Sequence, residues 1–142
     1  MTTLADLILA TRRRTRATAV GAAVLAAAAI WLAAVPLLGV DLQVAQPSGK
    51  PPAQITLPLV LATALAASLA GWGLLALLER LTRRARAIWT ATAVVALVAS
   101  FVPLLAPGTP TTSRVVLALM HLTVAAILIP SLTRSAPADP AA

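Results

Sequence analysis

Four apolar runs, each free of charged side chains and long enough to cross a bilayer, take up most of this 142-residue chain. The runs comprise residues 17–40, 51–78, 87–113 and 115–133. A membrane-spanning helix needs only about 20 apolar residues. In hydrocarbon every backbone polar group must be satisfied within its segment, and these alanine- and leucine-rich runs lack the alternation of barrel strands. The sequence therefore predicts an all-α membrane protein, a bundle of four transmembrane helices.

The composition excludes an ordinary water-soluble globular protein. Hydrophobic residues make up 60% of the chain and charged residues 11%, against about 25% charged in typical soluble domains. The net charge of +7 would suggest nucleic-acid binding in a soluble protein. Here the position of the cations at span ends explains the charge, so no nucleic-acid partner is expected. The absence of cysteine excludes disulfides and thiolate chemistry.

The spans and their connections use the whole length, so a single membrane domain is expected over 1–142. The expected segments are a cytoplasmic N-terminal segment at 1–16, spans at 18–38, 56–78, 87–105 and 115–132, outer loops at 39–55 and 106–114, a cytoplasmic loop at 79–86 and a cytoplasmic tail at 133–142.

Nine of the eleven cations lie on one side of the predicted bundle. They are Arg12, Arg13, Arg14, Arg16, Arg80, Arg83, Arg84, Arg86 and Arg134, whereas the other side has Lys50 and Arg114. Because positively charged loops stay in the cytoplasm, both termini are predicted to be cytoplasmic in an inner (plasma) membrane. A secretory signal has an apolar region of about 7–15 residues. The run at 17–40 is longer, so a retained anchor is expected.

Thr3 and Asp6 match a helix-start pattern, in which the threonine oxygen accepts a backbone N–H and the acid faces the helix N-terminus. Apolar residues then recur at helical spacing. This segment either lies flat in the membrane interface and turns into the first span near Arg16, or extends the first span.

The first outer loop alternates apolar and polar residues on both sides of a turn-rich centre at 46–52. This pattern predicts a small extracytoplasmic β-hairpin, with an irregular Pro-rich loop as the alternative. An isolated two-stranded hairpin is marginal in water, so it must lean on the helices or on the membrane surface. The predicted apolar face, which caps the bundle, consists of Leu42, Val44, Ile55 and Leu57, and the predicted polar face of Gln43 and Gln54.

His121 is the only histidine and the only ionisable side chain well inside a predicted span. At about 1.5 Å of rise per residue it lies roughly 10 Å below the outer end of the fourth span. Trp31, Thr63 and Ser100 fall in the same layer, and polar groups at that depth usually face the bundle interior. His121 is then either a proton-responsive or ligand-contacting group, or a neutral side chain that bonds to Thr63, Ser100 or a backbone carbonyl and fixes helix register.

Charged side chains near the span ends suggest two ion pairs. Asp41 and Arg114 flank the outer ends of two spans and are expected to pair across the mouth of the bundle. Glu79 either pairs with Arg83, four residues later on the same helix, or belongs to a solvated helix face. Trp89, which opens the third span, fits an interfacial aromatic belt.

Small residues recur along the second span and allow close helix contact. They are Ala62, Ala66 and Ala70, with Ala64, Ser68, Gly71 and Gly73 beside them. Their partner is either another helix of this chain or a helix of another copy.

Motifs for catalysis are missing from the sequence. It has no nucleotide-binding loop, catalytic triad or paired carboxylates. One histidine without cysteine or an intramembrane carboxylate does not supply the three or four ligands of a zinc site. We therefore expect no enzyme activity, no metal and no cofactor.

Four short motifs mark the spans: GVDL at 39–42, GWGLLALLER at 71–80, Trp89, and LMHL at 119–122. Together they resemble an uncharacterised family of small actinobacterial four-helix membrane proteins, a domain of unknown function. The likeness covers residues 12–135 and implies a membrane location without an activity. The excess of arginine over lysine and the abundant alanine are consistent with a GC-rich genome.

These features predict an accessory or assembly protein that acts through helix–helix contacts. Its expected partners are the lipid bilayer and either other membrane proteins or further copies of itself. The alternative is a small transporter, channel, or ligand or pH sensor that uses the polar layer around His121.

Overall fold

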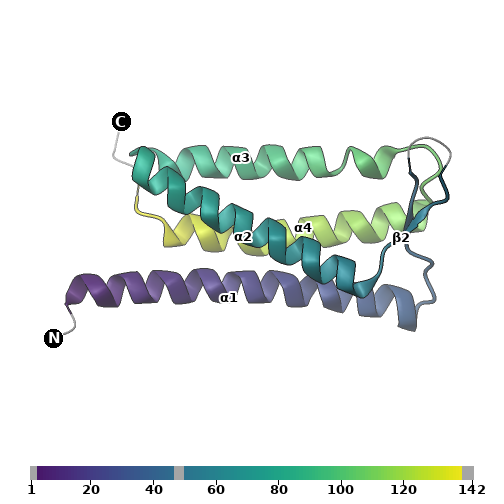
Figure 1. Cartoon of the computed structure of the whole chain (residues 1–142), viewed down its shortest axis with the longest axis horizontal. Coiled ribbons are helices and arrows are strands. Elements are labelled where there is room, and N and C mark those ends of the chain that lie inside the picture. Colours follow the sequence, from purple (N-terminus) through teal and green to yellow (C-terminus); the bar gives the residue numbers. More distant parts are fainter. Residues whose placement is uncertain (1–2, 47–49, 139–142) are drawn as a thin grey trace.

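The computed structural model describes residues 3–46 and 50–138 and contains four long helices and one small sheet (Figure 1). The helices are α1 (Leu4–Leu32), α2 (Leu57–Leu81), α3 (Ala85–Ser100) and α4 (Thr111–Ser135). A π-helical turn η1 (Ala33–Leu37) follows α1, a 3₁₀ turn η3 (Pro103–Leu105) follows α3, and strands β1 (Gln43–Val44) and β2 (Ala53–Gln54) form the sheet. Four helical segments are long and apolar enough to cross a membrane. The predicted all-α four-helix membrane protein is thereby confirmed.

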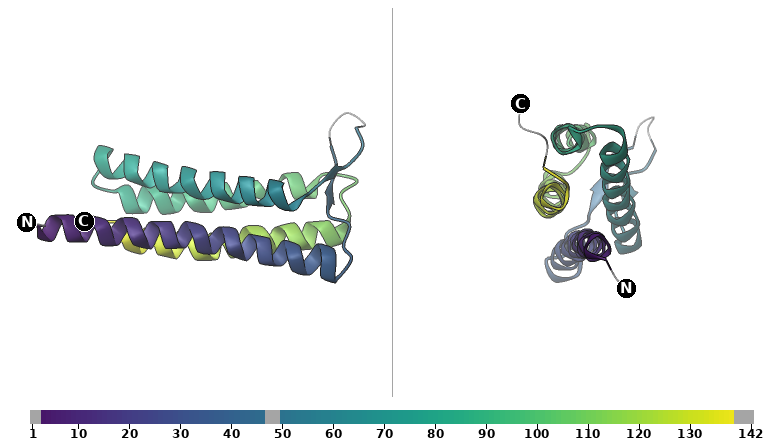
Figure 2. Two further views of the ribbon diagram at one scale, coloured as in Figure 1. Left: turned by 60° about the horizontal axis from the view of Figure 1, so that its bottom comes forward. Right: turned by 90° about the vertical axis from the view of Figure 1, so that its left-hand side faces the viewer.

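The helices α1, α3 and α4 run along the long axis of the bundle, whereas α2 crosses it obliquely (Figure 1). At one end of the bundle α2 begins beside α1, and at the other it ends beside the start of α3 (Figures 1 and 2). We call the end with the start of α1, the α2–α3 loop and the end of α4 the arginine-rich end. The opposite end, with β1, β2 and the loop before α4, is the hairpin end.

A capping box at Thr3 starts α1, as the sequence predicts. The Thr3 hydroxyl accepts the Asp6 backbone N–H at 3.3 Å, and the Asp6 carboxylate accepts the Thr3 backbone N–H at 3.0 Å. The helix then continues through Arg16 to Leu32 without a break. The N-terminal segment is therefore an extension of the first span, and its start projects past the other helices (Figure 2).

Prolines shape the helix ends. Pro36 has no backbone N–H to donate, and the helix around it widens into the π-helical turn η1. Pro103 has no backbone N–H to donate, and the α-helix of the predicted third span at 87–105 ends before it, so that α3 gives way to the 3₁₀ turn η3. Pro58 lies in the first turn of α2, where its missing N–H costs nothing.

The core has two apolar layers. Near the arginine-rich end all four helices contribute, with Ala19, Ala23, Leu75, Trp89, Leu128, Leu132 and Ala136 buried. Near the hairpin end the buried residues are Ala27, Leu42, Val60, Leu104, Leu117 and Met120. Within α3 the buried residues are Ala85 and Trp89, both in its first two turns. The second layer is therefore closed by the hairpin and η3 and not by the body of α3.

The predicted hairpin is present. Its strands are antiparallel, with Gln43 opposite Gln54, and the centre of its turn at 47–49 lies outside the described residues. Leu42 is 1% exposed, and Val44 and Ile55 pack against the same apolar layer. The hairpin thus leans on the helices, as two isolated strands must.

Two hydroxyl groups near the start of α4 fix this hairpin. The Ser113 hydroxyl accepts the Gln43 N–H at 3.1 Å and donates to the Asp41 carbonyl at 3.2 Å. The Thr109 hydroxyl accepts the Ala45 N–H at 3.1 Å. Both hydroxyl-bearing residues are buried. They satisfy backbone groups at the outer edge of β1 that would otherwise lack a partner.

The residue before α4 is Pro110, whose side chain makes no capping bond, and the nearby hydroxyls of Thr109 and Ser113 bond to the hairpin. One expectation for the hairpin is wrong. Leu57 does not belong to the hairpin face but is the first residue of α2.

Ser113→Ala is expected to destabilise the protein, because the Gln43 N–H would lose its partner inside the bundle. An unsatisfied buried polar group costs about 1–3 kcal/mol. Thermal unfolding in detergent measures this loss. The control is Thr112→Ala, an exposed neighbour in the same turn of α4, and equal melting temperatures for the two variants would contradict the role given to Ser113.

Candidate functional site

A cleft of about 350 Å³ lies between α2, α3 and α4, with a contribution from Ala27 of α1. Lining residues recur every three or four positions on each helix, so each helix turns one face to the cleft. At two of the cleft's lining residues α2 contacts α3 directly, since Trp89 Nε1 donates to the Gly71 carbonyl at 2.8 Å. Toward the hairpin end α2 leaves α3 and approaches α1 (Figure 1). The oblique course of α2 therefore creates the cleft.

Three of the four residues predicted to form a polar layer line this cleft: Thr63, Ser100 and His121. Each bonds to its own helix. The Thr63 hydroxyl donates to the Leu59 carbonyl at 2.7 Å and the Ser100 hydroxyl to the Leu97 carbonyl at 2.6 Å. The structure thus brings the three residues to one space without a hydrogen bond between them in the described part of the chain.

The imidazole of His121 is oriented from two sides. Its Nδ1 lies 2.7 Å from the Leu117 carbonyl, which can only accept, so Nδ1 carries the hydrogen. Its ring also lies against Phe101, with centroids 6.2 Å apart and planes at 45°, within the range of a tilted aromatic pair. Of the partners considered from the sequence, the backbone carbonyl is the one that the structure shows.

Trp31, the fourth predicted member of the layer, lies elsewhere. Its Nε1 donates to the Ile55 carbonyl at 2.7 Å, and its side chain packs in the apolar layer at the hairpin end. A buried indole N–H needs an acceptor, and the end of the hairpin provides one. Trp31 therefore ties α1 to the hairpin and does not line the cleft.

The expected pairing of Asp41 with Arg114 is also absent from the described residues. The Asp41 carboxylate accepts the side-chain amides of Gln43 and, at 2.9 Å, of Gln54. Arg114 donates to the Ala106 carbonyl at 3.1 Å. Both charged side chains therefore bond to nearby groups, Asp41 to the hairpin and Arg114 to the loop before α4.

A polar cluster that sequence reasoning missed joins three helices near the arginine-rich end. Arg16 of α1 is 5% exposed and makes a two-pronged ion pair with Glu79 of α2, at 2.5 and 3.2 Å. Its Nε donates to the Ser135 hydroxyl of α4 at 2.9 Å, and Nη2 lies 3.4 Å from the Ser135 carbonyl. Fork-shaped pairing of this kind is among the strongest that a carboxylate forms.

The cluster also explains why Glu79 is not paired with Arg83. Helix α2 ends at Leu81, so Arg83 lies in the loop and not one turn further along the helix. Glu79 and Ser135 both lie in the last turns of their helices, where the helix dipole is negative. A cation is favourable at such a place, and Arg16 provides it for both helices.

The sequence contained a signal for Arg16. Counted along α1, Arg16 falls in register with the buried residues Ala19, Ala23 and Ala27, whereas Arg14 lies on the opposite, exposed side. Helical spacing of three and four residues places Arg16 on the core face. Grouping all four N-terminal arginines as a single topological marker concealed this.

Trp89 does not occupy an interfacial belt. It is 3% exposed and part of the core, and it donates to the carbonyl of Gly71. A Cβ on Gly71 would lie 3.8 Å from the Trp89 ring and 3.9 Å from Leu132. The small residue thus allows α2, α3 and α4 to approach closely, as predicted for small residues in this helix.

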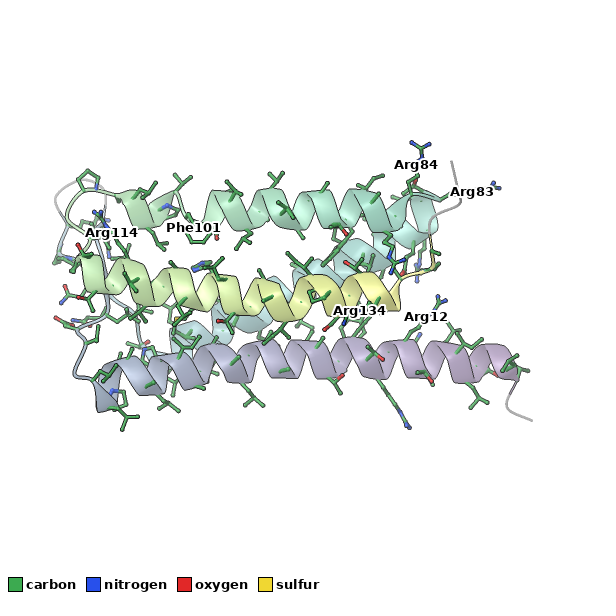
Figure 3. The ribbon with its side chains drawn as sticks, turned by 180° about the vertical axis from the view of Figure 1, so that it is seen from behind. Arg12, Arg83, Arg84, Phe101, Arg114 and Arg134 are labelled. Atoms are coloured by element: carbon green, nitrogen blue, oxygen red, sulfur yellow. The ribbon has the colours of Figure 1, made fainter. Side chains whose placement is uncertain are left out.

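The remaining arginines divide between the two ends of the bundle. Figure 3 shows Arg12, Arg83, Arg84 and Arg134 at one end and Arg114 at the other. The described residues contain no group of three or more His, Cys, Asp or Glu side chains that could hold a metal ion.

Four apolar helices with charges at their ends define a small multi-pass membrane protein. More specifically, the chain belongs to a family of unknown function, DUF6069, whose sequence model matches residues 8–138. No curated protein and no solved structure matches the chain. The resemblance to an uncharacterised family is thereby confirmed.

Breaking the Arg16–Glu79 pair is expected to destabilise the protein strongly. Glu79→Leu leaves the buried Arg16 guanidinium without its carboxylate, at a cost of about 3–5 kcal/mol. The double variant Arg16→Met with Glu79→Leu should recover most of this loss, since apolar pairs replace buried ion pairs well. Arg13→Met, at an exposed site on the same helix, is the control. Thermal unfolding in detergent compares these three variants with the wild type, and a double variant no more stable than Glu79→Leu would contradict the coupling.

Proposed function

We propose that this protein is an accessory or assembly protein of the plasma membrane that acts through lateral helix contacts. The supporting observation is a ridge of exposed small residues on α2, formed by Ala62, Ala66, Ala70 and Gly73. At 3.6 residues per turn these four lie on one side of the helix. The opposite side has the buried residues Val60, Ser68 and Leu75.

An outward ridge of this kind suits a partner helix better than lipid alone. Small residues let two backbones approach closely, and van der Waals packing then supplies the attraction that hydrophobicity does not supply in a bilayer. The other small residues of α2 already have partners in this chain, since Ser68 is buried and Gly71 adjoins Trp89. The ridge is left for a helix of another membrane protein or of a second copy.

We further propose that the arginine-rich end is cytoplasmic, so that both termini are inside and the hairpin faces outward. The strong bias of arginines to this end supports this orientation (Figure 3). The actinobacterial source remains a prediction from the sequence.

Single cysteines in this cysteine-free chain test the orientation. Gln46→Cys on the hairpin and Ala138→Cys after α4 replace exposed residues at opposite ends. In intact cells an impermeant thiol reagent should label Gln46→Cys, and Ala138→Cys only after the membrane is opened. The reverse order of labelling would overturn the proposed topology.

Bulky side chains on the ridge are expected to abolish association. Wild-type protein purified from its native host in mild detergent should carry a stoichiometric membrane partner or a second copy, and Ala66→Leu should lose it. Ala91→Leu, an equal change at an exposed site on α3, should retain it. Mass spectrometry and the mass of the intact complex provide the readout. A monomeric wild-type protein without a partner would contradict the proposal.

One observation favours the alternative, a ligand or pH sensor or a transporter: Thr63, Ser100 and His121 share a cleft. The two functions predict different effects of His121→Leu. An accessory protein should keep its partner in this variant, whereas a sensor or transporter should lose its response to ligand or pH.

A further inference from the structure

The polar side chains that line the cleft between α2, α3 and α4 all donate their hydrogens to backbone carbonyls. The hydroxyls of Thr63 and Ser100 donate to carbonyls of their own helices. His121 Nδ1 does the same toward Leu117, and Trp89 Nε1 donates to Gly71. Each of these groups has one hydrogen to give in its neutral form.

The same polar side chains still have oxygen and nitrogen lone pairs that can accept hydrogen bonds. In a neutral imidazole with its hydrogen on Nδ1, Nε2 is an acceptor, and no bond from Nε2 is found within the described residues. A hydroxyl oxygen that has donated its hydrogen can still accept, which adds Thr63 and Ser100. The cleft therefore offers up to three acceptors and no side-chain donor.

The rest of the lining is apolar and places the cleft in hydrocarbon. It consists mostly of alanine, valine and leucine side chains from helices that can span a membrane. In that setting a hydrogen-bond donor without an acceptor is costly, so an acceptor set in an apolar wall selects for a donor group. The volume of about 350 Å³ is at the small end of the range of about 300–1,000 Å³ that small-molecule sites occupy.

From this arrangement we propose that the cleft binds a neutral, hydroxyl-bearing apolar molecule from the bilayer, such as a long-chain or isoprenoid alcohol. Its hydroxyl donates to His121 Nε2, and its hydrocarbon part lies along Ala96 and Val124. This site does not depend on the ridge of α2 or on the proposed assembly function, because the cleft and the ridge use different residues of that helix.

The test uses two photoreactive probes on purified full-length protein in phosphatidylcholine nanodiscs. One probe is octanol with a diazirine in its chain, and the other is the matching diazirine octane without the hydroxyl. After irradiation, mass spectrometry locates the labels. We expect the alcohol to label cleft residues of α3 and α4 roughly three- to tenfold more than the alkane does, the factor that one net hydrogen bond provides.

Variants of the protein distinguish the contribution of the hydrogen bond to the hydroxyl from that of the apolar walls of the cleft. His121→Leu should reduce labelling by the alcohol to the level of the alkane while alkane labelling persists, which also shows that the cleft is intact. Thr63→Val, a change of nearly equal volume, is a second acceptor deletion. Ala96→Phe fills the cleft and should block both probes, whereas Ala99→Phe on the exposed side of α3 should block neither.

Two outcomes would overturn the proposal. Equal labelling of the cleft by the two probes would mean that ordinary acyl chains fill it without selection for a hydroxyl. Preferential labelling by the alcohol that survives His121→Leu would mean that a group other than His121 Nε2 selects it.

Discussion

The need to pair Arg16 inside an apolar environment determines how the arginine-rich end is built. A buried guanidinium without a counter-charge is among the most costly groups in a folded protein. Glu79 and Ser135 meet that need from two other helices, and both do so from last turns whose dipoles favour a cation. The spacing from Arg16 to the buried alanines of α1 then sets the register of α1 against α2 and α4.

At the hairpin end the same requirement is met by hydroxyl and indole groups in place of charges. Ser113 and Thr109 satisfy the backbone of β1, and Trp31 satisfies the end of the hairpin at Ile55. These bonds hold the start of α2 near α1. The two ends therefore use different chemistry for one purpose, which is to leave few polar groups unpaired where water is scarce.

Most of the fold follows from patterns that hydrocarbon imposes. Run length predicted four helices, Thr3 and Asp6 predicted the start of α1, and alternation around 46–52 predicted the hairpin. The partners of Glu79, Asp41 and Trp89 could not be read in this way, because each depends on which helix faces which, and spacing along one helix does not contain that information. Residue depth grouped Thr63, Ser100, His121 and Trp31; the first three line one cleft, whereas Trp31 lies elsewhere because depth says nothing about the direction of a side chain.

The course of α2 links the two proposed surfaces. Its end is held by the Arg16–Glu79 pair and by the bond from Trp89 to Gly71, while its start is held near α1 by the hairpin. A helix fixed at these points must cross the bundle obliquely, so it separates from α3 toward the hairpin end (Figure 1). That separation opens the cleft around His121 on one side of α2, and the buried face that α2 turns to the core directs Ala62, Ala66 and Ala70 outward on the other. Substitutions that alter the tilt of α2 would therefore affect both the cleft and the ridge. Substitutions within the cleft or on the ridge alone would affect only that surface.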